Sequence, residues 1–284
     1  MQTGLEISTS KPIPRSVWLP DASRRWFNNL WGLAAAPILF FFFIPIAAVF
    51  WRLSPADFFR SLVDAAVIQA VRLSLLTSLA SLALIILFGT PAAYYLYRRR
   101  SRLHWLLDTL VDLPTVLPPA VAGVALLIAF GREGLLGQNL RLIGISLPFT
   151  TTAVVLAQMF IAAPFYIRAA ALGFAAVDCE LKHAAALDGA SRWQIFRYIM
   201  LPMSAAPILS GCILAWARAL GEFGTTIIFA GNLAGRTQTM PLAIYIGFET
   251  KLEVAMTLSA ILILLSSLLL ILLKLIVNRR LADG

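Results

Sequence analysis

Long apolar runs separated by short polar segments set the pattern of this chain. A helix needs roughly 20 apolar residues to cross the hydrocarbon core of a bilayer. Runs of about that length predict an all-α membrane protein with six spans, at about 32–51, 73–97, 106–130, 149–171, 205–230 and 254–277. The third and fifth spans have the weakest patterns, because the third carries Asp108 and Asp112 at its margin and the fifth contains Arg218 and Glu222.

The first apolar run has an alternative interpretation as a signal peptide. Thirty-one residues precede it, however, and no small-residue cleavage site follows it. Trp31 and Trp51 stand at its two ends, where aromatic side chains typically mark a membrane interface. We therefore predict a retained span. Residues 1–28 are polar and contain three prolines, which predicts a flexible cytosolic tail before a single membrane domain at 29–280.

Composition excludes several classes of protein. The chain is 60% hydrophobic and 13% charged, where soluble domains average about 45–50% and about 25%. This composition argues against a disordered chain and against a soluble enzyme. Two cysteines, Cys179 and Cys212, are too few for a disulfide scaffold and stand in no metal-binding spacing.

The net charge of +9 mainly indicates how the chain is oriented in the membrane. With the N-terminus inside, the predicted inner segments carry 15 Lys and Arg residues and the outer segments carry 6. The excess of positive charge on the inner side predicts that both termini are cytoplasmic. The basic residues are divided among separate loops, which argues against nucleic-acid binding and favours contact with anionic membrane lipid.

The inner segment from Phe174 to Ser204 is patterned rather than linker-like. Residues 175–188 have helix-forming composition and stop at Gly189, a typical residue after a helix end. Ser191 followed by Gln194 is a capping box, which predicts a second short helix. We expect two short helices at about a right angle, on the cytosolic side between spans four and five.

Two functions fit such a pair of helices. One is an amphipathic hairpin lying on the membrane surface. The other is a docking surface for a partner protein. The acidic residues Asp178, Glu180 and Asp188 favour docking slightly, because anionic lipid would repel them.

At this segment the sequence resembles the signature loop of the permeases of ATP-binding-cassette importers. The matching residues are His183-Ala184-Ala185-Ala186-Leu187-Asp188-Gly189 and Ile199-Met200-Leu201-Pro202, with His183 where the family has Glu. The resemblance implies a coupling helix that sits in a cleft of an ATPase subunit. The candidate coupling residues are His183, Ala184, Ala185, Asp188, Gly189, Arg192, Trp193, Phe196 and Arg197.

Further stretches resemble the molybdate and sulfate permease group. Residues 113–123 are similar to its third span and residues 218–232 to its fifth, while 235–245 are closer to the molybdate/tungstate branch. The resemblance covers about 66–278. It implies a type I importer permease fold, two permease subunits, two cytosolic ATPase subunits, an extracytoplasmic oxyanion-binding protein, and a location in the bacterial inner membrane.

Arg218 and Glu222 are four residues apart inside the fifth span, so they share a helix face. One interpretation is that they neutralise each other within a bundle. The other is that Arg218 borders a water-filled path and attracts an anion. A neighbouring row of small residues on the same helix predicts close packing against another span: Gly211, Ala215 and Ala219.

Prolines and glycines predict bends in the third and fifth spans. The bending residues are Pro118, Pro119 and Gly123, then Gly221 and Gly224. Backbone groups freed at membrane depth are tolerated beside protein or a wet cavity. Hydroxyls nearby either line a pathway or bond back to their own helix. The pathway and gate candidates are Thr115, Pro118, Pro119, Arg218, Glu222, Phe223, Thr225, Thr226 and Asn232.

No catalytic set is evident in the sequence. It has no phosphate-binding loop, and His104 and His183 are too far apart along the chain to suggest a metal pair. We expect no metal or cofactor on this chain, with ATP and Mg²⁺ used by the partner ATPase. Six spans are few for a solute path, which favours a homodimer.

These observations predict a permease that imports a tetrahedral oxyanion, and molybdate or tungstate is the preferred assignment of the substrate. A sulfate or thiosulfate permease of the same group is the nearest alternative. A passive channel gated by the broken spans and a membrane-embedded enzyme are further alternatives, and both are disfavoured. A channel needs no docking loop, and an enzyme needs a catalytic set.

Overall fold

The computed structural model describes residues 21–98 and 102–282, and every regular element in these ranges is helical. The first helices are α1 (Asp21–Arg52), α2 (Pro55–Leu62), α3 (Ala65–Arg98), α4 (Arg102–Val116), α5 (Pro119–Phe130), α6 (Gly137–Leu142) and α7 (Thr151–Ala176). Then follow α8 (Cys179–Leu187), α9 (Arg192–Gln194), the π-helical η2 (Ile195–Met200), α10 (Leu201–Met203), α11 (Ala205–Leu220), α12 (Gly224–Phe229), α13 (Met240–Thr250) and α14 (Leu252–Ala282).

The chain divides into two compact units, Met1–Ala48 and Val49–Gly284. Residues 1–20 of the predicted tail lie outside the described residues, and residues 21–28 form the start of α1. The segment Leu30–Arg52 of α1 is long and apolar enough to cross a membrane. Its four consecutive phenylalanines, Phe40–Phe43, expose more than half of their surface. The predicted first span therefore coincides with a real helix of suitable length.

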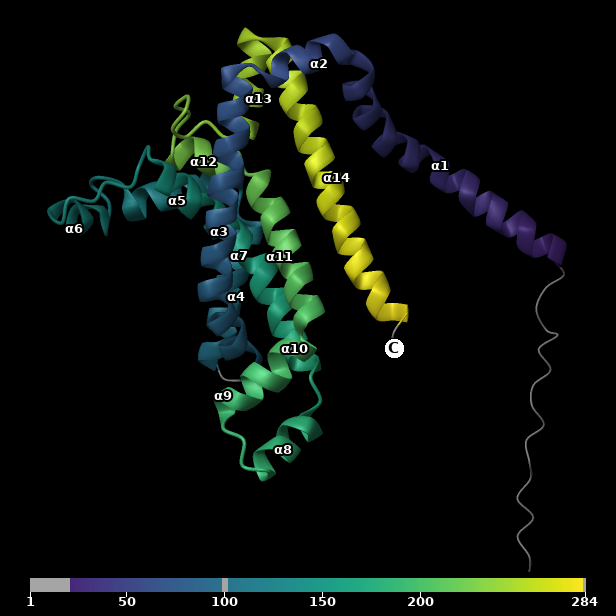
Figure 1. Cartoon of the computed structure of the whole chain (residues 1–284), viewed down its shortest axis with the longest axis vertical. Coiled ribbons are helices and arrows are strands. Elements are labelled where there is room, and N and C mark those ends of the chain that lie inside the picture. Colours follow the sequence, from purple (N-terminus) through teal and green to yellow (C-terminus); the bar gives the residue numbers. More distant parts are fainter. Residues whose placement is uncertain (1–20, 99–101, 283–284) are drawn as a thin grey trace, which may run out of the picture. The chain divides into compact units, whose positions relative to one another are not determined.

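In the second unit α3, α7 and α11 pack side by side (Figure 1). Small residues allow this approach: a Cβ added to Gly211 of α11 would stand 2.8 Å from the Cβ of Ala169 on α7. Ala215 and Ala219 are also fully buried. The prediction that this small-residue row packs against another span is confirmed.

Buried serines of α3 tie the neighbouring helices together. The Ser78 hydroxyl accepts a hydrogen bond from Nε1 of Trp216 on α11 (2.9 Å), and Ser81 donates to the carbonyl of Val155 on α7 (2.8 Å). Away from water such bonds satisfy polar groups that would otherwise be costly. The polar residues inside this apolar helix therefore have an architectural role.

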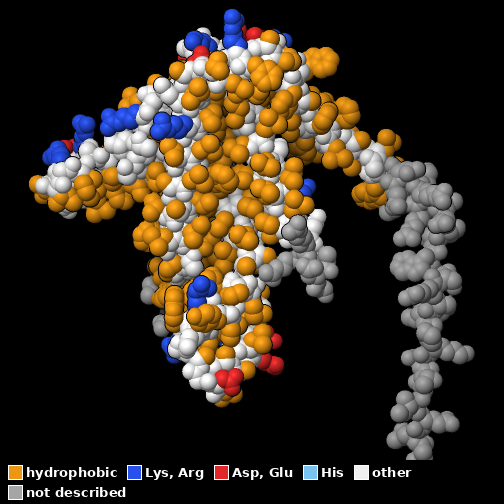
Figure 2. Space-filling view, in the orientation of Figure 1, with side chains coloured by type: hydrophobic (Ala, Val, Ile, Leu, Met, Phe, Trp, Pro, Cys, Tyr) orange, Lys and Arg blue, Asp and Glu red, His pale blue; other side chains and the backbone are white. Residues whose placement is uncertain are grey.

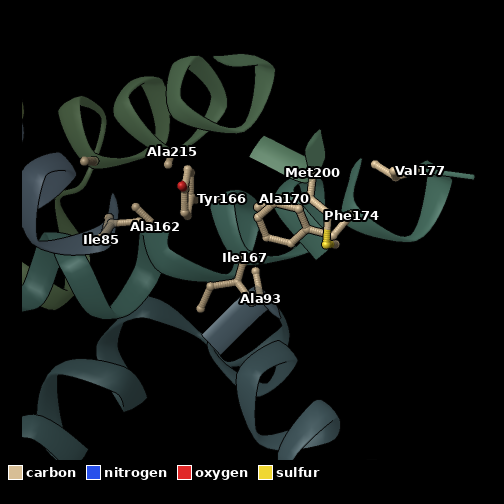
Figure 3. Packing of buried hydrophobic residues seen from close by; sticks show 11 residues of the cluster. Ile85, Ala93, Ala162, Tyr166, Ile167, Ala170, Phe174, Val177, Met200 and Ala215 are labelled. Atoms are coloured by element: carbon tan, nitrogen blue, oxygen red, sulfur yellow. The ribbon is translucent and has the colours of Figure 1, made fainter. Parts of the chain in front are cut away.

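An aliphatic and aromatic core fills one end of the α3–α7–α11 bundle. Figure 3 shows Phe174 of α7 beside Met200, the last residue of η2, with Ile167 and Ala93 below them. Hydrophobic side chains also cover much of the surface over α3, α11 and α14, while charged side chains gather near α2 and α13, near α6 and α12, and near α8 (Figure 2). A central apolar band between two charged ends is the distribution expected of a protein that spans a bilayer.

The count of spans depends on two bent helix pairs. Four described helices are long and apolar enough to cross a membrane, and the number reaches six if each bent pair is one span. The third predicted span, at 106–130, is bent as its prolines predict: α4 and α5 form a pair at 119° to each other, interrupted at Leu117 and Pro118. Proline at the first position of α5 is compatible with a helix start but not with continuation of α4.

The fifth predicted span is also interrupted. Helix α11 ends at Leu220, residues 221–223 are not helical, and α12 begins at Gly224. A further bend of 70° separates Arg192–Met203 from α11 at Ser204. The predicted bends at both proline- and glycine-rich segments are thus confirmed, whereas their size required tertiary information.

Candidate functional site

The patterned loop forms a protruding pair of helical segments at one end of the second unit (Figure 1). Helix α8 begins at Cys179, later than the predicted helix at 175–188, because the Asp178 carboxylate accepts the backbone N–H of Glu180 (2.9 Å) and caps the new helix. Gly189 then turns the chain with φ +84°, a conformation that side-chain-bearing residues rarely adopt. The predicted stop is confirmed.

The second segment begins with the predicted capping box. Backbone N–H of Gln194 donates to the Ser191 hydroxyl (3.3 Å), and backbone N–H of Ser191 donates to the Gln194 amide oxygen (2.7 Å). From there α9, η2 and α10 follow without a break to Met203, so this segment is longer than the predicted short helix. We call residues 178–203 the coupling segment.

The coupling segment presents a mixed apolar and charged surface. Leu187 is 89% exposed and Trp193 is 68% exposed. Large apolar side chains that protrude in this way are typical of protein–protein contact sites. Ala185 and Phe196 are half-buried, and the exposed predicted coupling residues are His183, Ala184, Asp188, Gly189, Arg192, Trp193 and Arg197.

Phe196 connects this surface to the helix bundle. Its ring centroid lies 4.9 Å from that of Tyr94 on α3, 5.7 Å from Phe174 on α7, and 5.7 Å from Trp193. Tyr97 on α3 completes the group, with its ring 6.0 Å from Phe174. We call these five residues the aromatic cluster. Aromatic pairs at such separations are attractive beyond their buried area, so the cluster joins the coupling segment to two long helices.

Sequence reasoning missed most of the aromatic cluster. Only Trp193 and Phe196 are among the predicted coupling residues. Tyr94 and Tyr97 belong to the second predicted span, and Phe174 begins the predicted inner segment outside the candidate set. A run of tyrosines near the end of α3 (Tyr94, Tyr95 and Tyr97) was the available signal.

A second cross-helix contact was also missed. Arg168 of α7 pairs with both Asp108 and Asp112 of α4, in each case with a nitrogen–oxygen distance of 2.5 Å. From the sequence, the two aspartates mark only the margin of the third predicted span, and Arg168 is one of the 15 basic residues assigned to the inner segments. Arg168 in fact lies within α7. The available signal was two carboxylates four residues apart, which share one helix face.

The pathway candidates in the fifth span centre on a buried carboxylate. Glu222 is 1% exposed, pairs with Arg218 at 2.8 Å, and accepts the backbone N–H of Thr225 (2.7 Å). In the structure Arg218 and Glu222 therefore neutralise each other, as the first of the two interpretations predicted. Glu222 also caps the start of α12, because it satisfies an N–H that the helix itself leaves unpaired.

The break between α4 and α5 meets the break between α11 and α12. A Cβ added to Gly224 would lie 2.6 Å from the Cβ of Pro119, and the Thr225 hydroxyl donates to the Pro119 carbonyl (3.1 Å). Gly123 is equally close to Ile228, at 2.7 Å from an added Cβ to its Cβ. We call this junction the paired break.

The remaining pathway candidates have different surroundings. Thr115 is exposed, and its hydroxyl donates to the Asp112 carbonyl of its own helix (2.7 Å). This is the second of the two alternatives predicted for the hydroxyls, a bond back to the same helix. Thr226 and the amide oxygen of Asn232 are buried, and neither finds a partner among the described residues. Phe223 packs on Tyr245 with a centroid distance of 5.5 Å. Pro118 and Pro119 are exposed at the paired break.

Comparison with known proteins agrees with this architecture. The family model described as "Binding-protein-dependent transport system inner membrane component" matches residues 85–283. The chain is 39% identical over 245 residues to "Probable transport system permease protein NifC" of Clostridium pasteurianum, covering 86% of each chain. It is 38% identical over 256 residues to "Molybdenum transport system permease protein ModB" of Mycobacterium tuberculosis strain H37Rv, covering 90% of this chain and 92% of that one.

Solved structures show the same fold at lower identity. A chain of a bacterial alginate ABC transporter, crystallised with an alginate pentasaccharide-bound periplasmic protein, matches with a TM-score of 0.68 and 17% identity. The match covers 90% of this chain and 94% of that chain. The chain therefore belongs to the family of binding-protein-dependent transport system inner membrane components, and it is a multi-pass, non-catalytic membrane subunit.

Proposed function

We propose that this chain is the membrane permease subunit of an ATP-driven importer for a tetrahedral oxyanion, with molybdate or tungstate as substrate. The observation that carries the proposal is the 38% identity, over 90% of the chain, to a relative named as a molybdenum transport permease. The similarity of residues 235–245 to the molybdate/tungstate branch supports the same substrate.

The coupling segment is the docking site for a cytosolic ATPase in this proposal. Exposed Leu187 and Trp193 supply apolar anchors, and His183, Asp188 and Arg192 supply a polar rim. Such a centre with a polar surround fits the general anatomy of protein interfaces. Two permeases, two ATPases and an extracytoplasmic binding protein form the working complex, and both termini of the permease are cytoplasmic.

In this proposal the aromatic cluster transmits the movement of the ATPase subunits to the membrane helices. Closure of the ATPase pair shifts the coupling segment, and Phe196 passes that shift to α3 and α7, whose rings it contacts. Packed interiors transmit displacement because they have little room to deform locally.

The paired break is the gate region of the same proposal. Pro118 and Pro119 are exposed where two interrupted helices meet, and Thr115 is exposed on the last turn of α4 just before them. An ion that must be released is better served by weak neutral donors than by tight charged ones. Arg218 is already neutralised by Glu222, which keeps the local charge low.

Proteoliposomes test the proposal directly. Vesicles that contain the permease and its ATPase should take up labelled molybdate only with binding protein outside and ATP inside. Excess tungstate should compete strongly and excess sulfate weakly. Uptake without ATPase or ATP would contradict an ATP-driven importer, and strong competition by sulfate would assign the substrate to the sulfate group.

A further inference from the structure

A pocket of about 400 Å³ lies between the last turns of α3 and the start of α9. Its lining residues are Pro91, Tyr94, Tyr95, Arg98 and Arg192. The volume falls within the range of ~300–1,000 Å³ that small-molecule sites occupy. The pocket has no part in the gate and touches the coupling segment only at Arg192.

The charge in this pocket is uncompensated within the part of the chain that the structure describes. Neither Arg98 nor Arg192 pairs with any carboxylate there, in contrast to Arg141, Arg168, Arg218 and Lys251. The three acidic residues of the coupling segment do not line the pocket. Two arginines that line one pocket without a counter-charge suit a phosphate-type anion.

Arg98 is exposed and contacts the Tyr94 side chain on the same face of α3. Its guanidinium donates to the Tyr94 hydroxyl (3.3 Å), and its central carbon lies 5.3 Å from the centre of the Tyr94 ring. The Arg98 guanidinium keeps other donors for a ligand, since it carries five N–H groups.

The surroundings favour a lipid over a free ion. Helix α3 has 34 residues, about 51 Å at ~1.5 Å per residue, so its end extends beyond a hydrocarbon core of ~30 Å. Tyr95 and Trp105 are 43% and 71% exposed near this end, as expected of side chains at a membrane interface. The sequence continues as Arg99-Arg100-Ser101-Arg102, so the local composition is strongly basic.

We propose that this pocket binds the phosphate headgroup of an anionic phospholipid. The lipid bridges α3 and the coupling segment through Arg98 and Arg192. Basic pockets beside membrane helices on the cytoplasmic side are suited to such headgroups. The inference rests on the proposed orientation, which places this end at the anionic inner leaflet.

Native mass spectrometry of the purified full chain tests the proposal with phosphatidylglycerol and phosphatidylcholine of equal chain length as probes. The wild type should retain phosphatidylglycerol preferentially. Arg98→Gln and Arg192→Gln should each weaken this retention about fivefold. Arg98→Lys and Arg192→Lys should restore most of it, and the exposed Arg132→Gln should leave it unchanged.

Several results would overturn the assignment. Wild-type retention in the double Gln variant would show that the lipid binds elsewhere. Displacement of the lipid by millimolar inorganic phosphate would assign the pocket to a free anion. Arg98 lies outside the proposed docking surface, so loss of ATPase binding in Arg98→Gln with unchanged lipid retention would assign the pocket to a protein partner. Retention needs neither ATPase nor substrate, so failure here is distinct from failure of molybdate uptake.

Discussion

At the scale of single residues, the paired break depends on the absence of a side chain at Gly224. An added Cβ would lie 2.6 Å from the Cβ of Pro119, closer than packed atoms allow. We expect Gly224→Ala to lower the free energy of unfolding by about 1–3 kcal/mol, because crowding a packed contact costs that much. The variant should also slow uptake, since it separates the two interrupted helices.

Gly221→Ala is the matched control for this prediction. Gly221 belongs to the same break, but an added Cβ would meet only the Ala217 carbonyl oxygen, at an ordinary 3.7 Å. Thermal unfolding of the purified proteins in one detergent compares the two. Equal stability of both variants would contradict the close packing of Gly224 on Pro119.

Local residue patterns predicted local structure well. Ser191 with Gln194 specifies a helix start, and Gly189 specifies a left-handed turn, because each acts on backbone within a few residues. The pairing of Arg168 with Asp108 and Asp112 joins positions 60 and 56 residues apart. No periodicity in the sequence encodes which face of α7 meets which face of α4, so this contact required the fold.

At the scale of elements, the turn at Gly189 sets how α8 and α9 are presented. Proline has φ near −65°, which is incompatible with the observed +84°. We expect Gly189→Pro to abolish co-purification of the ATPase while the permease still inserts in the membrane. Gly144→Pro is a closely matched control, because Gly144 also has a positive φ (+79°) and open space around it, but lies next to α6.

The outcome separates a local effect from a general one. Loss of ATPase binding in both proline variants would point to global misfolding. Retained binding and uptake in Gly189→Pro would remove the coupling segment from the docking site.

The aromatic cluster makes a different prediction from the docking surface. Phe196→Ala removes the ring that contacts Tyr94 and Phe174, yet leaves Leu187 and the charged rim in place. We expect the ATPase to bind normally while uptake per ATP hydrolysed falls about tenfold, within the coupling energies that packed networks carry.

Tyr198→Ala provides the comparison on the same helical segment. Tyr198 is 72% exposed and lies outside the aromatic cluster, so its removal should leave the ratio of uptake to hydrolysis unchanged. Simultaneous measurement of phosphate release and molybdate uptake gives that ratio. A normal ratio in Phe196→Ala would exclude Phe196 as the link between the ATPase and the spans.

At the scale of the whole molecule, apolar length predicts where long helices lie but not how the interrupted ones are bent. The regions at 73–97, 149–171 and 254–277 became the long helices α3, α7 and α14. The region at 106–130 has the same length but folds as two helices at 119°. Proline and glycine in the sequence predict that a helix is interrupted. The angle of the bend depends on packing against another interrupted helix, and only the assembled fold shows that contact.

Orientation is a property of the whole chain, and the two cysteines give a direct measurement of it. Cys179 is exposed at the start of α8, whereas Cys212 is half-buried within α11. In a Cys212→Ser variant, a membrane-impermeant maleimide should label Cys179 in inverted vesicles and leave it unlabelled in right-side-out vesicles. An Asn139→Cys substitution on α6, in a chain without other cysteines, should give the reverse pattern, because Asn139 is exposed in a predicted outer segment. Labelling of Cys179 from outside would place the coupling segment away from ATP, and an ATPase could not then drive this permease through it.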